Sequence, residues 1–325
     1  MTPHDRLALA LADDLAKVNE TLHSYMQSDA APRIRQVSAH LIDAGGKRLR
    51  PMLTVAAARL CGYDGPHHIH LAATVEFIHT ATLLHDDVVD DSKQRRGRPT
   101  ANLLWDNMSS VLVGDYLFSR AFQLMTITGS MPILAALADA SATIAEGEVL
   151  QLSTARDLSA TPETYIRIAR GKTAALFSAA TRVGAMLAEP GDAIVQAMHD
   201  YGDALGIAFQ IADDLLDYTG TDAIGKNRGD DLREGKLTLP VIWALDKADA
   251  AERAFWTRTI GKGDVQDGDF DAALSIMDKR GSLLATADEA RRWAGLAKAA
   301  LQALPPQPLR ETLEELADYV VARLS

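Results

Sequence analysis

The chain contains a single cysteine, Cys61, among its 325 residues. One thiol can form neither a disulfide framework nor a cysteine-based metal cluster within one chain. A reducing environment suits such a protein, and we therefore expect it to be cytoplasmic.

Long uncharged apolar runs are also missing. A membrane-spanning helix needs about 18 or more apolar residues, and even residues 168–188 are interrupted by Arg170, Lys172 and Arg182. Residues 1–26 carry acidic side chains among apolar ones and lack the basic-then-apolar order of a signal peptide. We expect no transmembrane segment and interpret residues 1–26 as an amphipathic helix.

An excess of basic residues is absent as well. The chain has 33 Lys and Arg against 44 Asp and Glu, a net charge of −11. No overall positive field would attract a nucleic acid, so that class of partner is disfavoured. There is no low-complexity linker and no fixed-period repeat, and we expect one domain over residues 1–325.

Alanine and leucine are abundant, alternating β-branched runs are scarce, and apolar residues recur at three- and four-residue spacing. This pattern predicts an all-α fold. Clusters of Gly, Pro and Asp predict about nine to eleven helices. The expected breaks are 62–67, 92–100, 129–132, 159–162, 189–192, 219–236, 261–269 and 304–308.

Two apolar segments are interrupted by the same acidic pattern. Asp86, Asp87 and Asp90 follow the run Ala81–Leu84, and Asp213, Asp214 and Asp217 lie among the apolar residues of 207–216. Carboxylates four residues apart share one helical face, where they repel each other unless a cation neutralises them. One such cluster is explained equally well as a solvated helix end, but two copies are not.

Oxygen-only ligands favour Mg²⁺ or Mn²⁺, and Mg²⁺ completes its shell with water and substrate phosphate. Two carboxylate clusters on two helices therefore suit several metal ions around one diphosphate. Basic side chains that could bind phosphate lie near them in sequence, in the segments 45–51, 95–99 and 225–236.

Five segments carry a specific resemblance: GGKRLRP, HDDVVDDSKQRRGRPTAN, GKTA, FQIADDLLDY and GKNRGDDLREGKLTLP. In this order, across residues 45–240, they resemble the trans-isoprenyl (polyprenyl) diphosphate synthase family. The resemblance implies an isoprenoid-synthase helical bundle around a central cavity, a homodimer, and three Mg²⁺ ions per active site, replaceable by Mn²⁺. It implies a prenyltransferase that joins isopentenyl diphosphate to an allylic diphosphate.

The same resemblance assigns roles to individual residues. The expected metal ligands are Asp86, Asp90, Asp213 and Asp217, with Asp87 and Asp214 beside them in the catalytic set. Isopentenyl diphosphate would be bound by Lys47, Arg50, His79 and Arg96. The allylic diphosphate would be bound by Arg95, Lys172, Thr173, Gln210 and Lys226, of which Arg95, Lys172, Gln210 and Lys226 also assist catalysis.

Product length is expected to depend on Ala81 and Thr82, one turn before the first aspartate motif. In the family, bulky aromatics here accompany short products, so two small residues resemble the long-chain enzymes that make quinone side chains, such as that of ubiquinone. Helix packing would explain small residues too. A transient membrane contact during product release is left open.

Four alternatives stay open. A short-chain farnesyl or geranylgeranyl synthase shares all of the chemistry, and product length alone separates it. A non-catalytic partner subunit would be expected to lose its aspartate motifs, which are complete here. A terpene cyclase would not need the isopentenyl diphosphate residues. A purely structural helical scaffold leaves the two aspartate triplets unexplained.

Overall fold

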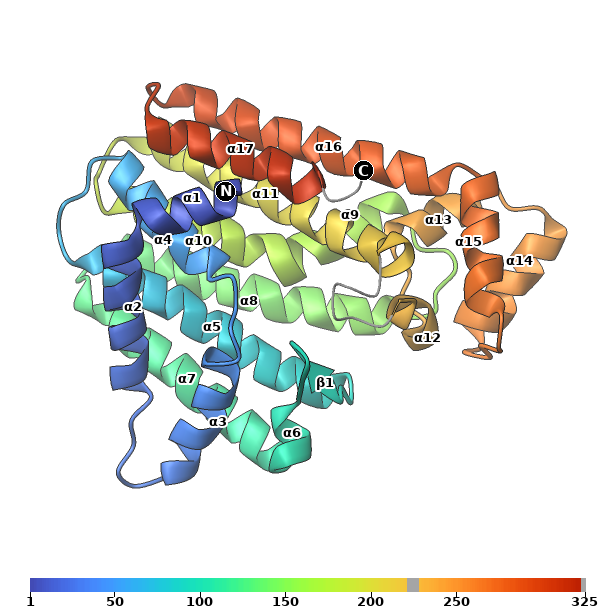
Figure 1. Cartoon of the computed structure of the whole chain (residues 1–325), viewed down its shortest axis with the longest axis horizontal. Coiled ribbons are helices and arrows are strands. Elements are labelled where there is room, and N and C mark those ends of the chain that lie inside the picture. Colours follow the sequence, from blue (N-terminus) through green and yellow to red (C-terminus); the bar gives the residue numbers. More distant parts are fainter. Residues whose placement is uncertain (221–227, 323–325) are drawn as a thin grey trace. The chain divides into compact units, whose positions relative to one another are not determined.

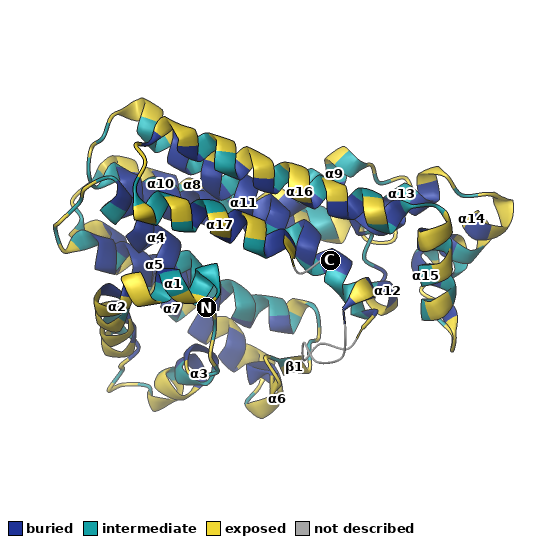
Figure 2. Cartoon of the chain, turned by 45° about the horizontal axis from the view of Figure 1, so that its top comes forward, coloured by how far each residue is buried: buried dark blue, intermediate teal, exposed yellow. Residues whose placement is uncertain are grey.

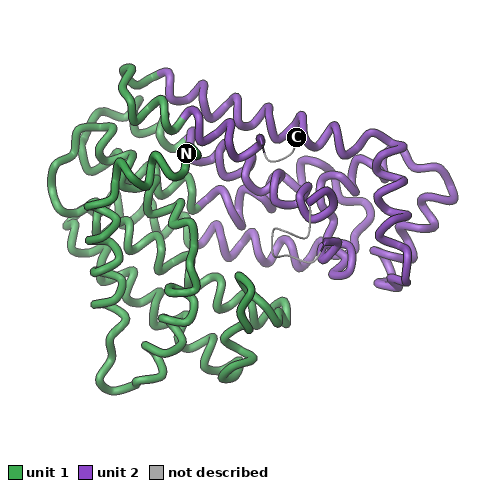
Figure 3. The backbone as a smooth tube through the Cα atoms, in the orientation of Figure 1, with its two compact units in different colours: residues 1–141, 176–199, 303–313 green, residues 142–175, 200–302, 314–325 purple. Residues whose placement is uncertain are grey.

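The computed structural model describes residues 1–220 and 228–322, and the regular secondary structure within them is helical apart from one small hairpin (Figure 1). It divides into two compact units (Figure 3). Unit 1 comprises residues 1–141, 176–199 and 303–313, and unit 2 comprises residues 142–175, 200–302 and 314–325. The predicted all-α fold is confirmed.

The first half of the chain supplies most of unit 1. Its elements are α1 (Pro3–Ala10), α2 (Ala12–Tyr25), α3 (Pro32–Ile42), α4 (Leu49–Leu60), α5 (His67–Val89), β1 (Gln94–Arg95), β2 (Arg98–Pro99), α6 (Ala101–Leu104) and α7 (Asn107–Ile127).

The second half supplies unit 2. Its elements are α9 (Pro162–Ala169), the π-helical turn η1 (Arg170–Ala174), α12 (Asp230–Glu234), α13 (Leu239–Asp246), α14 (Ala250–Trp256), the π-helical turn η3 (Thr257–Gly261), α15 (Asp269–Lys279) and α16 (Ser282–Ala300). Residues of both units occur in α8 (Met131–Thr154), α10 (Ala175–Met186), α11 (Asp192–Thr219), the 3-10 turn η4 (Leu301–Ala303) and α17 (Pro308–Ala322).

Helix α5 is the centre of unit 1. It packs most extensively on α7 and also contacts α2 and α4. Every residue from Leu71 to Ile78 is buried, so this stretch is enclosed on all sides (Figure 2). A helical stretch that is buried around its whole circumference is stable only inside a protein. The core of unit 1 therefore holds the helix that carries the first aspartate motif.

Unit 2 has its own apolar cluster around the end of α11. Tyr218 and Trp256 are fully buried there, with side chains from α12, α13, η3 and α15. Tyr218 also stacks on Phe270, with ring centroids 6.3 Å apart. This cluster fixes the end of the helix that carries the second aspartate motif.

The expected number of helices, about nine to eleven, was too low. Every expected break except 219–236 falls between helices or at a helix end. The segment 219–236 contains α12, and its residues 221–227 lie outside the described part of the chain. The described residues contain seventeen α-helices, several of them one or two turns long. Residues 1–26 form two helices rather than one, because Leu11 leaves helical geometry. No helix of the described residues is long and apolar enough to cross a membrane.

Gly184 marks a close contact between two helices of unit 1, α10 and α4. A β-carbon built there would lie 2.3 Å from the Thr54 carbonyl oxygen and 2.9 Å from the Ala57 Cβ of α4. We expect Gly184→Ala to lower the free energy of unfolding by about 1–3 kcal/mol through overpacking, measured by urea denaturation.

The matched control for this prediction is Gly295→Ala in α16, where a new β-carbon meets nothing within 4 Å. Alanine has the higher helix propensity, so this variant should be as stable as the original or up to about 1 kcal/mol more stable. Equal stability of both variants would contradict the close approach of α10 and α4.

Candidate active site

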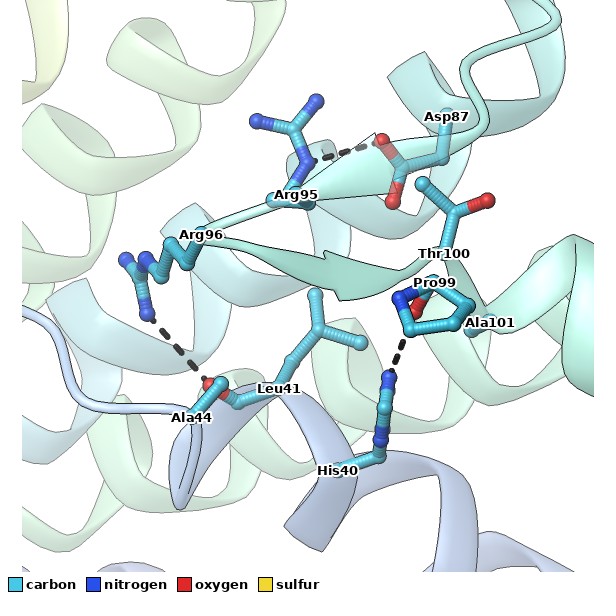
Figure 4. A pocket seen from close by; sticks show the side chains of 9 residues that line it. All are labelled: His40, Leu41, Ala44, Asp87, Arg95, Arg96, Pro99, Thr100 and Ala101. Atoms are coloured by element: carbon cyan, nitrogen blue, oxygen red, sulfur yellow. Dashed lines mark hydrogen bonds and ion pairs between the residues drawn. The ribbon is translucent and has the colours of Figure 1, made fainter. Parts of the chain in front are cut away.

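The first aspartate motif lies at the C-terminal end of α5. Asp86 and Asp90 are half-buried, whereas Asp87 is fully buried. The Arg95 Nε donates to Asp87 Oδ1 at 2.7 Å (Figure 4). Burial raises the pKa of Asp87, and the Arg95 guanidinium partly opposes this shift. The middle carboxylate thus has a cationic partner, and it is more buried than Asp86 and Asp90.

The segment that carries Arg95 and Arg96 is a short hairpin, in which Arg95 pairs with Arg98 and Gln94 with Pro99. Three side chains fix its base (Figure 4 shows the His40 contact). His40 Nε2 donates to the Pro99 carbonyl at 2.8 Å, Thr100 Oγ1 to the Ser92 carbonyl at 2.7 Å, and Asn102 Nδ2 to the Asp87 carbonyl at 3.3 Å.

Sequence reasoning assigned no role to His40, Thr100 or Asn102. The last two belong to the quoted segment ending in PTAN, which was a usable signal. His40 lies 59 residues from its partner, and nothing in its local sequence pointed to that contact.

Arg50 and His79 form a second pair in unit 1. Arg50 Nη1 lies 3.2 Å from His79 Nε2, and the guanidinium stacks over the Phe177 ring at 4.5 Å. A guanidinium can only donate, so Nε2 must accept and the imidazole proton sits on Nδ1. Burial, reinforced by Arg50 and other nearby arginines, holds the pKa of His79 well below its usual value. His79 is therefore neutral at pH 7.

Burial lowers the pKa of Arg50 to about 10, so Arg50 remains charged at neutral pH. The Glu76 carboxylate opposes that shift and the Arg96 guanidinium adds to it, which places these groups within electrostatic range of Arg50. The guanidinium of Arg96 also lies over the backbone at Gly46, where a β-carbon would be 2.8 Å from Nη2. Lys47 is exposed on the same segment.

A buried carboxylate compensates this cluster of positive charge. Glu76, in the middle of α5, forms an ion pair with Arg48 and is only 3% exposed. Arg48 begins α4 in a left-handed conformation, with φ at 48°, and also donates to the Ile42 carbonyl at 2.7 Å. Sequence reasoning missed Glu76, although a lone acidic residue inside an apolar helix was a visible signal.

The two residues expected to affect product length lie one turn before Asp86. Ala81 is fully buried. Thr82 is half-buried, and its hydroxyl donates to the His79 carbonyl at 2.8 Å. The dependence of product length on these two residues stays a prediction.

The second aspartate motif lies in the last turns of α11, in unit 2. Asp214 is 8% exposed and accepts two hydrogen bonds, from Tyr165 Oη at 2.6 Å and from Gln210 Nε2 at 2.7 Å. Burial raises the pKa of Asp214 to about 6. Asp213 is half-buried beside it. As in the first motif, the middle carboxylate is the most buried of the three.

Asp217 contacts the N-terminus of α12. Its two oxygens accept the backbone N–H groups of Asp230 and Asp231, each at 3.2 Å. Each carboxylate oxygen has a second lone pair, so this capping leaves capacity for a metal ion. The contact joins the end of α11 to the start of α12.

Thr173 and Lys172 lie on the π-helical turn η1. Thr173 Oγ1 donates to Gln210 Oε1 at 2.5 Å, and Lys172 Nζ donates to Glu148 Oε2 at 3.0 Å. The turn packs closely on α8, since a β-carbon at Gly147 would lie 2.7 Å from the Lys172 backbone nitrogen. Insertions of this kind often occur at functional sites, because they rotate the following side chains out of α-helical register.

The predicted residues thus fall into two groups. Unit 1 contains Lys47, Arg50, His79, Ala81, Thr82, Asp86, Asp87, Asp90, Arg95 and Arg96, and unit 2 contains Lys172, Thr173, Gln210, Asp213, Asp214 and Asp217. Lys226 lies outside the described residues. Sequence reasoning missed Tyr165 and Glu148, which lie 49 and 24 residues from their partners.

The donor chemistry suits a hard divalent cation. Both motifs lie at the C-terminal ends of long helices, where the helix dipole is negative and further carboxylates are unfavourable. A bound cation removes that penalty. Among the described residues, no three or more imidazole, thiol or carboxylate groups gather into a metal site. Mg²⁺ needs only one or two protein carboxylates when water and phosphate supply the rest.

The sequence is similar to a known protein family over most of its length. A family model described as polyprenyl synthetase matches residues 31–277. The chain is 45% identical over 317 residues to octaprenyl diphosphate synthase of Escherichia coli strain K12, with 96% of both chains covered.

Two crystal structures are similar over nearly the whole chain. A decaprenyl diphosphate synthase from Rhodobacter capsulatus has a TM-score of 0.97 and 66% identity, covering 99% of both chains. A polyprenyl synthase from Caulobacter crescentus CB15, complexed with calcium and isoprenyl diphosphate, has a TM-score of 0.94 and 52% identity, covering 99% of this chain and 98% of its own.

The Glu76 ion pair gives a stability prediction. Glu76→Gln removes the carboxylate from Arg48 inside the core, and we expect a loss of about 3 kcal/mol in the free energy of unfolding. As a control, Asp288→Asn breaks an exposed pair with Arg291 and should cost less than about 1 kcal/mol. Denaturant titration of both variants distinguishes them, and a Glu76→Gln variant as stable as the control would contradict the structural role of the buried pair.

Asp214 gives a prediction for pH dependence. Its pKa is about 6 in the folded chain against an ordinary value of 3.8, so the folded state holds this proton more tightly. The associated stability is fully present below pH 3.8 and is lost as the pH rises through 6. At about 1.4 kcal/mol per pKa unit, the loss is up to about 3 kcal/mol.

Asp214→Asn should remove this contribution. Urea denaturation at pH 4.5 and pH 7, with a chelator present, should show a smaller change in stability between the two values than in the original protein. Asp271→Asn, at an exposed position of α15, serves as the control and should keep the original pH profile. An unchanged profile for Asp214→Asn would contradict the desolvation of this carboxyl group.

Proposed function

The chain belongs to the polyprenyl synthetase family, and from this we propose that it is a long-chain all-trans polyprenyl diphosphate synthase. It would extend an allylic diphosphate with isopentenyl diphosphate units. The observation that carries the proposal is the pair of aspartate motifs at the ends of α5 and α11, each with its own polar support. The octaprenyl and decaprenyl synthases among its relatives favour a long product over the short-chain alternative.

Divalent-metal dependence is general in this family. We propose Mg²⁺, three ions per active site, with Mn²⁺ able to substitute. Asp86, Asp90, Asp213 and Asp217 would hold the ions. The Caulobacter crescentus relative was crystallised in complex with calcium and isoprenyl diphosphate, and this supports a divalent cation and a prenyl diphosphate as ligands here. Once bound, the ions supply positive charge to the departing diphosphate.

The protein cations have complementary tasks in this proposal. Arg50, Arg96 and Lys47, with neutral His79, would bind isopentenyl diphosphate. Glu76 offsets part of the repulsion between Arg50 and Arg96, and a bound diphosphate would offset more of it. His79 would then contribute its Nδ1 proton as a neutral donor, while its Nε2 accepts from Arg50.

Arg95, Lys172 and Lys226 would stabilise the negative charge that develops on the allylic diphosphate as its C–O bond breaks. Arg95 and Lys172 have the carboxylate partners Asp87 and Glu148, which limit the movement of their side chains before substrate binds. The hydroxyl of Thr173 and the amide of Gln210 would face the allylic cation. The residues that bind isopentenyl diphosphate would orient its double bond for attack on the cation. Exclusion of water would prevent hydrolysis of the cation to an alcohol.

Several further predictions rest on the sequence alone. We propose that residues 1–325 act as one synthase domain, that the protein is a cytoplasmic homodimer, and that its product serves quinone side-chain synthesis. We also propose that the protein contacts a membrane transiently when it releases its apolar product.

The function is tested with purified protein, labelled isopentenyl diphosphate, Mg²⁺, and geranyl, farnesyl or geranylgeranyl diphosphate as primer. We expect all-trans products of about octaprenyl to decaprenyl length, and no incorporation with a chelator. Asp86→Ala should lower turnover at least 100-fold through lost electrostatic stabilisation. Products of only C15 or C20 length would support the short-chain alternative, and cyclised products without incorporation would refute the synthase.

Product length gives a separate prediction. Ala81→Phe places an aromatic ring one turn before Asp86, where it should block chain growth and shorten the main product, measured by chromatography. Thr82→Val is the control, because it keeps the volume of the side chain and should leave product length unchanged. Retained folding is checked by thermal unfolding, since Ala81 is fully buried. Unchanged length in a folded Ala81→Phe variant would show that the growing chain passes elsewhere.

A further inference from the structure

A chain of hydrogen bonds in unit 2 joins four side chains from three elements. Tyr165 Oη of α9 donates to Asp214 Oδ2 at 2.6 Å, Gln210 Nε2 donates to Asp214 Oδ1 at 2.7 Å, and Thr173 Oγ1 of η1 donates to Gln210 Oε1 at 2.5 Å. Tyr165, Asp214 and Thr173 are 5%, 8% and 6% exposed. Water therefore has little access to Tyr165, Asp214 and Thr173, whereas Gln210 is partly buried.

The direction of each bond follows from the donors available. An ionised carboxylate only accepts, so the NH₂ group of Gln210 must face Asp214 and its carbonyl oxygen must face Thr173. The hydroxyl proton of Thr173 is then committed to that carbonyl. Lone pairs on Thr173 Oγ1 and Gln210 Oε1 remain, and these two atoms present negative partial charge. The Asp214 carboxylate thus sets the orientation of both dipoles.

Tyr165 lies at the other end of this series of hydrogen bonds. Its hydroxyl satisfies the second oxygen of Asp214, which is buried and would otherwise lack a donor. With both oxygens bound, the carboxylate plane is fixed, and with it the direction in which Gln210 is held. The ring itself is buried in α9, which begins with a side-chain cap from Thr161 to the Thr164 backbone nitrogen and with Pro162 in its first turn.

We propose that Tyr165 is a positioning residue which, through Asp214, orients the oxygen atoms of Gln210 and Thr173 toward the allylic cation. This inference rests on the proposed function, in which Gln210 and Thr173 face that cation. Tyr165 itself touches no substrate. By fixing the Gln210 amide, Tyr165 keeps a carbonyl oxygen directed at the hydrocarbon cation, and this oxygen favours positive charge. If the amide could rotate, its N–H donors could face the cation instead.

The test compares two ligands that differ only in charge. One is an allylic analogue in which an ammonium nitrogen replaces the carbon that becomes positive, and the other is its neutral carbon isostere. Both are titrated by calorimetry into the full chain with Mg²⁺ and inorganic diphosphate. The ratio of the two Kd values reports the preference for a cation, and it is insensitive to a general loss of binding.

We expect the original protein to prefer the ammonium analogue, and Tyr165→Phe to reduce that preference about tenfold, which corresponds to one hydrogen bond to a charged group. kcat should fall by a similar factor while KM for isopentenyl diphosphate stays the same. Asp214→Asn, which frees the Gln210 amide, should lose the preference too. This second variant keeps the test informative if Tyr165→Phe folds poorly.

Tyr218→Phe is the matched control. Tyr218 is another fully buried tyrosine of unit 2, and its hydroxyl makes no hydrogen bond to a carboxylate among the described residues. This variant should keep the original cation preference. Turnover of the unmodified protein tests the proposed function separately. An active enzyme whose cation preference is the same in Tyr165→Phe, or equally reduced in Tyr218→Phe, would overturn the positioning role alone.

Discussion

The structure depends on one electrostatic constraint, the placement of carboxylates at the negative ends of two long apolar helices. Asp86, Asp87 and Asp90 end α5, and the second triplet lies in the last turns of α11. Helix dipoles disfavour anions at these positions, and burial disfavours them further. Such an arrangement is stable only when cations or hydrogen-bond donors are supplied. In this protein the partners are an arginine at the first motif, and tyrosine, glutamine and backbone N–H donors at the second.

Both motifs stabilise their buried carboxylate with hydrogen-bond donors, but the donor residues differ. The middle carboxylate of each is the most buried, and each has its own protein donors: Arg95 for Asp87, and Tyr165 with Gln210 for Asp214. The outer carboxylates are less buried. This division suits a site in which the middle residues organise neighbouring side chains and the outer residues bind metal ions.

Local sequence predicted the parts of this arrangement that are close together in the chain. The all-α fold, the two acidic helices and the proximity of Arg95 to the first motif follow from periodicity and short spacing. Tyr165, Glu148 and Glu76 were missed because their partners lie 49, 24 and 28 residues away, and only the packing of different helices brings them together. The helix count was too low for a related reason, since breaks such as the one at Leu11 carry no Gly or Pro signal.

The central claim is that both motifs bind metal ions around one diphosphate. Crystallography with Mn²⁺ and an unreactive allylic thiodiphosphate tests it directly, because anomalous scattering locates each ion. The account predicts Mn²⁺ bound to Asp86 and Asp90 and further Mn²⁺ bound to Asp213, all sharing one diphosphate. Ions at one motif only, or a diphosphate bound without contact to either motif, would contradict it.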